Sequence, residues 1–189
     1  MTKEELRKSQ LKARRLLSQT EVNLRSEQIL AQLKTLDIWT KNCFHTFVPI
    51  ERNKEVNTWP LIHYLRDDLV KEVVVPKTNF HDFSMENIRF DTGTELYKNK
   101  FGIFEPVRGI IVNEQDVEVV FVPLLAFSPD GHRVGYGKGF YDRFLAKCSK
   151  DVIKIGLSIF DESFDIQNIK SSDVRLDYCV SPNKIITFK

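Results

Sequence analysis

The sequence predicts an α/β protein built on a mainly parallel sheet, and three observations support this fold class. Helical and extended patterns alternate along the chain, as they do in proteins made of βαβ units. The segment 117–122 is continuously apolar, which is typical of a strand buried on both faces of a parallel sheet. A glycine-rich turn follows it and leads into a helical pattern, the place where open α/β sheets bind ligands. The 189 residues contain no repeat or long linker, so we expect one domain spanning residues 1–189.

Two helices are expected at the N-terminus. Over residues 3–17 an apolar helical face is opposed by a basic one, with Leu6, Ala13 and Leu17 on the first and Lys3, Arg7 and Arg14 on the second. Residues 18–21, Ser-Gln-Thr-Glu, have the spacing of a capping box and predict the start of the second helix. Its core-facing positions are Val22, Ile29, Leu33 and Leu36. A basic helix face is most often solvated, so the basic residues alone indicate no partner.

Most of the remaining elements are strands. Residues 43–48 are expected to form the first strand, and Asn-Thr-Trp-Pro at 57–60 starts a helix. A second strand, 71–75, is expected to end at Pro76. Residues 80–113 are interpreted as a small β excursion over the site, in which Phe101 and Phe104 can stack on a flat ligand, although core positions are more frequent for phenylalanine. Further strands are expected at 117–122, 152–159, 178–180 and 184–188.

Composition and charge narrow the classes of function. The net charge of +2 does not indicate a polyanionic partner such as nucleic acid. The three cysteines form no C-x-x-C pair and the four histidines lack zinc-site spacing, so neither a disulfide framework nor a zinc site is expected. No apolar run approaches the ~18 residues of a membrane helix. The basic N-terminus contains Glu4 and Glu5 and no apolar region of a signal peptide. We therefore expect a cytoplasmic monomer with reduced thiols that binds no membrane.

The most informative segment is the turn that holds three alternating glycines, Gly135, Gly137 and Gly139. Glycines let the backbone take positive φ and bring its N–H groups close to an anion. Arg133 and Lys138 add positive charge, and the following helix would point its positive end at the same place. Asp142 stands where Mg²⁺ bound to phosphate would accept a ligand. The loop fits neither G-x-G-x-x-G nor G-x-x-x-x-G-K-[ST], so a flexible turn followed by a first-turn carboxylate stays an alternative.

Two segments of the chain resemble a known family. The string Gly131-x-Arg-Val-Gly-x-Gly-Lys-Gly-Phe-Tyr-Asp-Arg143 is similar to the signature of the 5-formyltetrahydrofolate cyclo-ligases, also called 5,10-methenyltetrahydrofolate synthetases. The opening Lys3-Glu-Glu-Leu-Arg7, with Arg15 and Ser18, resembles the first helix of the same family. The likeness runs from Lys3 to about Val180. It implies the three-layer, Rossmann-like arrangement shared with sugar-phosphate isomerases and CoA transferases.

The resemblance implies an ATP- and Mg²⁺-dependent conversion of 5-formyltetrahydrofolate to 5,10-methenyltetrahydrofolate, with release of ADP and phosphate. In the family mechanism the formyl oxygen attacks the γ-phosphorus, and the folate N10 closes onto the phosphorylated iminium before phosphate departs. The residues that match family ATP contacts are Lys3, Arg7, Arg133, Val134, Gly135, Tyr136, Gly137, Lys138, Gly139, Phe140 and Tyr141. Those that match folate contacts are Val48, Glu55, Tyr136, Gly137, Lys138, Gly139 and Phe140. Lys138 and Arg133 are the expected catalytic cations, and Asp142 and Asp173 the expected metal ligands.

The chain also departs from the family pattern, and other interpretations stay open. Ser128 stands where many relatives have an aspartate before the glycine loop, and Tyr136 stands where several have arginine. Glu55 and Asp173 can instead be surface or capping carboxylates. One rival function is a nucleic-acid or polyphosphate binding module built on the basic first helix. Another is a sugar-phosphate isomerase, which needs no ATP and whose carboxylate base has no match here.

Overall fold

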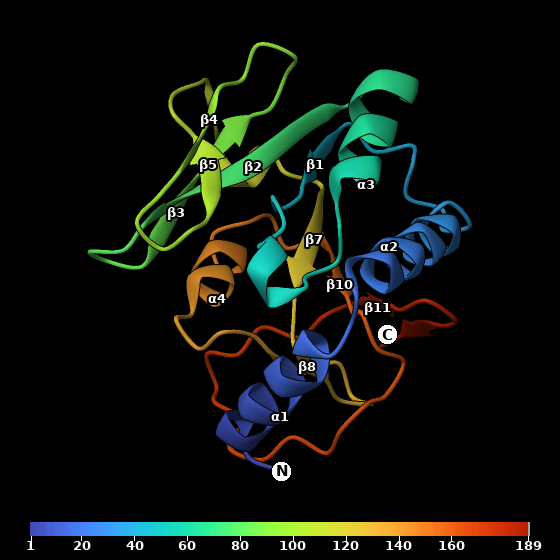
Figure 1. Ribbon diagram of the computed structural model, residues 1–189. Coiled ribbons are helices and arrows are strands. Elements are labelled where there is room, and N and C mark those ends of the chain that lie inside the picture. The colour runs from blue at the N-terminus through green and yellow to red at the C-terminus, as the bar shows by residue number, and fades with distance from the viewer. Residues whose placement is uncertain (189) are drawn as a thin grey trace.

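An eight-stranded sheet runs through the centre of the molecule in the computed structural model, which describes residues 1–188 (Figure 1). Within that range, five neighbouring strands are parallel: β11 (Tyr178–Val180), β10 (Ile153–Leu157), β7 (Val119–Pro123), β1 (Cys43–His45) and β2 (Glu72–Asn79). Antiparallel strands flank them: β12 (Ile185–Thr187) beside β11, then β3 (Ser84–Arg89) and β6 (Ile111–Val112) beyond β2. The mainly parallel α/β fold class predicted from the sequence is confirmed.

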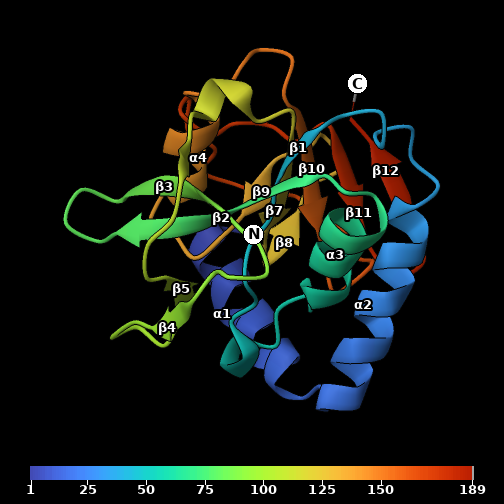
Figure 2. The ribbon, with the colours of Figure 1, turned by 90° about the horizontal axis from the view of Figure 1, so that it is seen from above.

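Helices cover both faces of this sheet (Figure 2). On one face, α2 (Gln19–Leu33) and α3 (Trp59–His63) bury Ile29, Leu33 and Ile62 against the strands. On the other, α4 (Phe140–Leu145) buries Phe144 and Leu145. Each fully buried side chain of this size contributes about 1.5–3 kcal/mol, so these two layers supply most of the driving force for folding. The capping box predicted at residues 18–21 is present at the start of α2.

Helix α1 (Lys3–Arg15) lies beside the end of β7, against the hairpin of β8 (Ala126–Phe127) and β9 (Arg133–Val134) (Figure 1). Its buried residues are Leu6, Gln10 and Arg14, which are spaced four apart and share one face. Placing Arg14 on a basic face opposite Leu6 was therefore wrong, because the residue shares the buried face and is only 2% exposed. This face covers loops rich in backbone polar groups, so it carries polar as well as apolar side chains.

The segment after β2 forms the β excursion that the sequence predicts. β2 continues through Pro76 to Asn79 and pairs with β3, so the expected end at Pro76 was wrong. Beyond the end of β1, β2 is paired with β3 alone and is therefore an edge strand. Proline is tolerated in an edge strand. β4 (Leu96–Lys98) and β5 (Phe104–Pro106) form a second small sheet, and short helical turns occupy Glu51–Asn53, Tyr64–Asp68 and Glu114–Asp116. None of the helices found in residues 1–188 has the length and apolar character needed to cross a membrane.

Candidate active site

The glycine loop, residues 135–139, connects β9 to α4. Gly137 and Gly139 have φ values of 88° and 73°, as the alternating glycines predict, but Gly135 does not take positive φ. The β8–β9 hairpin separates the loop from β7, so the loop does not follow that strand directly. From the helix side, Arg143 Nη1 donates a hydrogen bond of 2.8 Å to the Lys138 carbonyl. The loop is therefore held in one conformation from both ends.

Helix α1 meets this loop through Arg7. The Arg7 Nε donates to the Gly135 carbonyl at 2.8 Å. The guanidinium also lies against Gly137, where an added Cβ would come 3.0 Å from Arg7 Cζ. At Gly135 an added Cβ would meet no atom within 4 Å, so that side of the loop is open. Arg7 thus lies on the loop that was predicted to bind phosphate, as its expected role requires.

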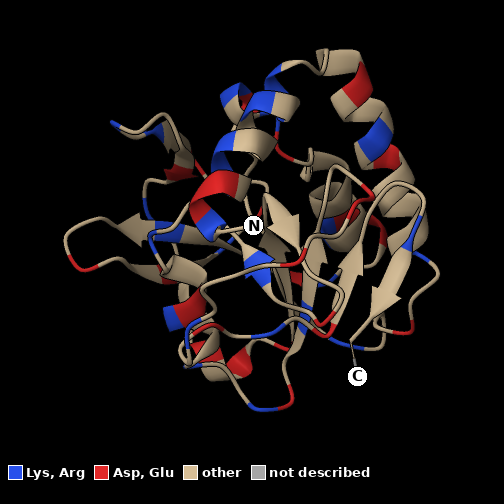
Figure 3. Ribbon diagram, turned by 90° about the horizontal axis from the view of Figure 1, so that it is seen from below, with Lys and Arg blue, Asp and Glu red and all other residues tan. Residues whose placement is uncertain are grey.

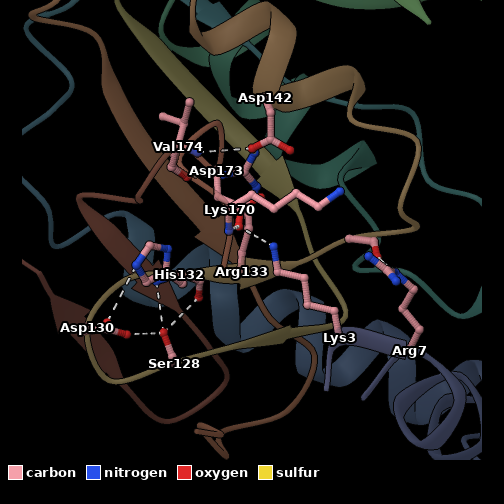
Figure 4. A network of polar contacts seen from close by, with 11 residues as sticks. Lys3, Arg7, Ser128, Asp130, His132, Arg133, Asp142, Lys170, Asp173 and Val174 are labelled. Carbon is pink, nitrogen blue, oxygen red and sulfur yellow. Dashed lines mark hydrogen bonds and ion pairs between the residues drawn. The ribbon is translucent and has the colours of Figure 1, made fainter. Parts of the chain in front are cut away.

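Two ion pairs lie beside the loop, and each joins a predicted phosphate-binding cation to a predicted metal ligand (Figure 4). Lys3 Nζ contacts Asp173 Oδ2, and the two side chains are 14% and 16% exposed. Arg133 Nη2 donates to Asp142 Oδ1 at 2.7 Å, and the Arg133 side chain is 6% exposed. Arg133 also donates to the carbonyl of Val174, the residue after Asp173. The guanidinium therefore connects the two acidic positions.

The two carboxylates fit a magnesium ion that is bound mainly through phosphate. Within residues 1–188, Asp142 Oδ2 and Asp173 Oδ1 have no hydrogen-bond or ion-pair partner. Burial alone would raise the pKa of Asp173, but hydrogen bonds from Lys3 and the Lys170 amide lower it, which keeps the carboxylate ionised. Residues 1–188 contain no cluster of three or more His, Cys, Asp or Glu side chains that could hold a metal ion. Mg²⁺ commonly takes one or two carboxylates and completes its shell with phosphate and water.

Glu55 is 4% exposed, which rules out a surface carboxylate. Its Oε2 accepts from the Ile50 amide at 2.7 Å, and its Oε1 accepts from the Tyr136 hydroxyl at 2.7 Å. Burial raises the pKa of Glu55, while the Ile50 amide, Tyr136 and the charge of Arg14 oppose the rise. Burial also raises the pKa of Tyr136, so the phenol stays a donor. Glu55, which was predicted to contact the folate, and Tyr136 of the glycine loop are thus joined by a hydrogen bond.

An aromatic surface lies next to Lys138 and consists of Phe80, Phe83, Phe101 and Phe140. The ring centroids of Phe80 and Phe101 are 3.9 Å apart, and Phe140 lies 5.3 Å from Phe80. Lys138 Nζ is 5.7 Å from the centroid of Phe83. Phe101 is 37% exposed, whereas Phe104 packs against the main core. The two phenylalanines of the β excursion therefore differ, and Phe101 is the one that belongs to this aromatic surface.

Of three other predicted contact residues, two have buried side chains and the third has a buried hydroxyl group. Val48 belongs to the main core, and Val134 packs with Leu6 of α1. The Tyr141 hydroxyl is buried without a hydrogen-bond partner in the described chain, and its ring lies edge-on to His45 with centroids 5.7 Å apart. At Val48 and Val134 the backbone, not the side chain, is what a ligand could reach.

Sequence reasoning missed Arg14 and the carboxylate of the β8–β9 turn. Ser128 donates to Asp130, and its hydroxyl accepts from the His132 amide at 3.0 Å (Figure 4). Asp130 therefore supplies a carboxylate that orders this turn. It lies two residues after position 128, where many relatives have an aspartate. Arg14 could have been found from its spacing, because it lies eight residues after the buried Leu6 on the same helical face.

Comparison with known proteins shows what the whole chain is similar to. The model of the 5-formyltetrahydrofolate cyclo-ligase family matches residues 1–181. The 5-formyltetrahydrofolate cyclo-ligase of Escherichia coli is 31% identical over 138 residues, which are 69% of this chain and 74% of that one. The structure of Aquifex aeolicus 5,10-methenyltetrahydrofolate synthetase has a TM-score of 0.82 and 31% identity, covering 99% of this chain and 93% of its own. The Mycoplasma pneumoniae synthetase has a TM-score of 0.78 at 23% identity, covers 97% and 100%, and supports the fold alone.

Proposed function

Because the chain belongs to the 5-formyltetrahydrofolate cyclo-ligase family, it carries out the ATP-dependent conversion of 5-formyltetrahydrofolate to 5,10-methenyltetrahydrofolate, and we propose that the glycine loop is where it does so. One observation carries the assignment of the site. Arg7 from α1, Arg133 before the loop and Asp173 near the C-terminus meet around residues 135–139 (Figure 4). The convergence of these segments puts cations and carboxylates beside a backbone that is open to a ligand.

We propose that the triphosphate of ATP lies along the open side of the glycine loop. Loop N–H groups and the side chains of Arg7, Arg133 and Lys138 would neutralise its charge. Lys3 would exchange its contact with Asp173 for a phosphate oxygen. Mg²⁺ would be held by the unpartnered oxygens of Asp142 and Asp173, where it would neutralise charge on the phosphates.

The folate is proposed to bind between Glu55 and the aromatic surface. The pterin presents an N3–H and a 2-amino group as a paired donor edge, which a carboxylate matches. Phe101, which packs on Phe80 with the two ring planes tilted by 32°, offers a flat face to an aromatic ring of the substrate. Residues 136–140 would border both substrates, so the formyl oxygen and the γ-phosphate would meet there.

Attack of the formyl oxygen on phosphorus requires alignment and neutralised charge more than a strong base. Lys138 and Arg133 suit this chemistry because both present donors beside the loop. We further propose the Rossmann-like arrangement implied by the resemblance, and a cytoplasmic monomer whose buried free thiols at Cys43, Cys148 and Cys179 suit a reducing compartment. Figure 3 shows Lys and Arg along most of α1, acidic residues in its first turn, and both signs of charge mixed over the rest of that side, which is not the uniform basic face of a nucleic-acid surface.

The test is the absorbance of the methenyl product from purified protein and 5-formyltetrahydrofolate. Product should form with ATP and magnesium and should be absent without ATP. Product formation that does not depend on ATP, or tight oligonucleotide binding without turnover, would contradict the proposal. Replacing magnesium by excess chelator separates the metal requirement from the ATP requirement.

A further inference from the structure

Segments far apart in the chain meet at the buried carboxylate of Glu55. Ile50 belongs to the loop after β1, Tyr136 to the glycine loop and Arg14 to α1. We propose that Tyr136 and Arg14 are positioning residues, which hold the Glu55 carboxylate in one orientation toward the folate. This inference rests on the proposed binding of the pterin by Glu55.

The hydrogen bonds fix the carboxylate without saturating it. One oxygen accepts from the Ile50 amide and the other from the Tyr136 hydroxyl, each at 2.7 Å. An ionised carboxylate has about four lone-pair sites, so one site on each oxygen is left for a ligand. Two parallel acceptors of this kind match the paired donors of a pterin edge. Tyr136 therefore orients the group that reads the substrate.

Arg14 supplies the positive charge that a buried carboxylate requires. The residue is 2% exposed, its Nη2 donates to the Leu124 carbonyl, and its Nε has no partner among residues 1–188. Its charge attracts Glu55, and its guanidinium also interacts with the Tyr136 phenol. Arg14 and Glu55 form no ion pair within 4.0 Å, so the charge of Arg14 acts on the carboxylate from beyond direct contact, whereas Tyr136 holds it by a hydrogen bond. The Tyr136 phenol donates to Glu55 without adding a positive charge. An arginine at this position would be a second buried cation beside Arg14, and its desolvation would be costly.

The test is a double-mutant cycle of Tyr136→Phe and Glu55→Gln, with the Michaelis constants for both substrates measured. Tyr136→Phe should raise the KM for 5-formyltetrahydrofolate about tenfold, the scale of a lost hydrogen bond to a charged group. The KM for ATP should change much less. In the Glu55→Gln background, Tyr136→Phe should add little, because the carboxylate that it orients is gone. Tyr64→Phe, in a helical turn far from the loop, is the matched control for loss of a tyrosine hydroxyl.

Two failures of this cycle have different meanings. If Glu55→Gln leaves the KM for folate unchanged, the proposed folate contact is wrong. If Glu55→Gln raises that KM and Tyr136→Phe either does not or acts additively, the positioning role is overturned. Arg14→Lys, which keeps the charge and removes the planar fork, should raise the folate KM less than Arg14→Met. If Arg14→Lys and Arg14→Met raise the KM for folate equally at equal Tm, the positive charge of Arg14 is not the cause of the increase.

The pH profile gives a readout that loss of packing alone would not move. The titratable and charged groups that act on Glu55 are Arg14, Tyr136 and Tyr141. The hydrogen bond from Tyr136 lowers the pKa of Glu55 against the effect of burial, so its removal raises that pKa further. The ionised form binds the pterin donors, and folate affinity is lost as pH falls through this pKa. In Tyr136→Phe the loss should begin at higher pH, whereas an unshifted acid limb would contradict the proposal.

Discussion

Lys138 differs from Lys3 and Arg133 because its amine forms no ion pair within the described chain. It lies over the ring of Phe83, exposed and available to the transferred phosphoryl group. Lys138→Ala should reduce kcat at least ~100-fold, the scale for one preorganised electrostatic group, without lowering Tm. Lys98→Ala is the control, since that lysine also lies over a phenylalanine ring but outside the loop. Activity within a few-fold of the parent would remove Lys138 from the catalytic role.

Gly135 and Gly137 separate the conformational role of glycine from its role in ligand access. An alanine Cβ at Gly137 would meet Arg7 in a backbone with φ of 88°, which costs about 1–2 kcal/mol in strain alone. Gly137→Ala should therefore lower Tm. Gly135→Ala meets no atom within 4 Å, so it should keep Tm and raise the KM for ATP. Thermal unfolding and ATP titration of both variants decide between these outcomes, and a Gly135→Ala enzyme with unchanged ATP binding would place the phosphates elsewhere.

At the scale of helices and strands, the sequence predicts the features that depend on local spacing, such as caps and apolar faces. The helix of residues 19–33 has both its capping box and its apolar face in the sequence, and the structure confirms them. Pro76 and Arg14 were misplaced because neighbouring segments decide their surroundings. Pro76 lies where β2 has lost a neighbouring strand, and Arg14 is buried by loops that come more than a hundred residues later. No local pattern shows where β2 loses that neighbour, whereas the spacing of Arg14 from Leu6 does mark the buried face of α1.

Helix α1 brings two cations to the site on one face and exposes others. Lys3→Ala with Arg7→Ala should raise the KM for ATP much more than the KM for 5-formyltetrahydrofolate, because both residues lie beside the proposed phosphate site. Lys8→Ala with Lys12→Ala removes the same charge from the exposed face and should change neither constant. Titration of ATP and of an oligonucleotide against both pairs is the measurement. Intact ATP affinity with lost oligonucleotide affinity would favour the nucleic-acid module.

At the scale of the whole molecule, the sequence identifies the members of the site but not their pairing. The glycine loop is contiguous, so its motif is visible in one segment. The Lys3–Asp173 and Tyr136–Glu55 contacts join residues 170 and 81 positions apart. Only the folded sheet brings them together, because its strand order places the first helix and the C-terminal segment at the same end. The resemblance to a family supplied the roles, and the fold shows which residues act on one another.

The central strand β1 carries a titratable group in the core of the molecule. His45 is 0% exposed, and neither ring nitrogen has a hydrogen-bond partner in residues 1–188. Its ring packs against Phe144 with centroids 4.7 Å apart. Burial lowers the pKa of His45 from its ordinary value of 6.5 to about 3. The folded protein therefore keeps this imidazole neutral over a range of pH in which the unfolded chain protonates it.

This difference predicts how the stability of the whole protein depends on pH. The unfolded chain binds a proton at His45 below about pH 6.5, whereas the folded protein does not. This difference alone should lower the free energy of unfolding by about 1.4 kcal/mol for each unit that the pH falls from about 5.5 to about 4. His45→Leu should remove the part of that slope that comes from His45, because this imidazole is no longer there to be protonated on unfolding. His81→Gln, which changes an exposed histidine, should keep it. Urea unfolding of the three proteins across this range is the measurement. If the parent and His45→Leu have the same slope, His45 is not held neutral by the fold.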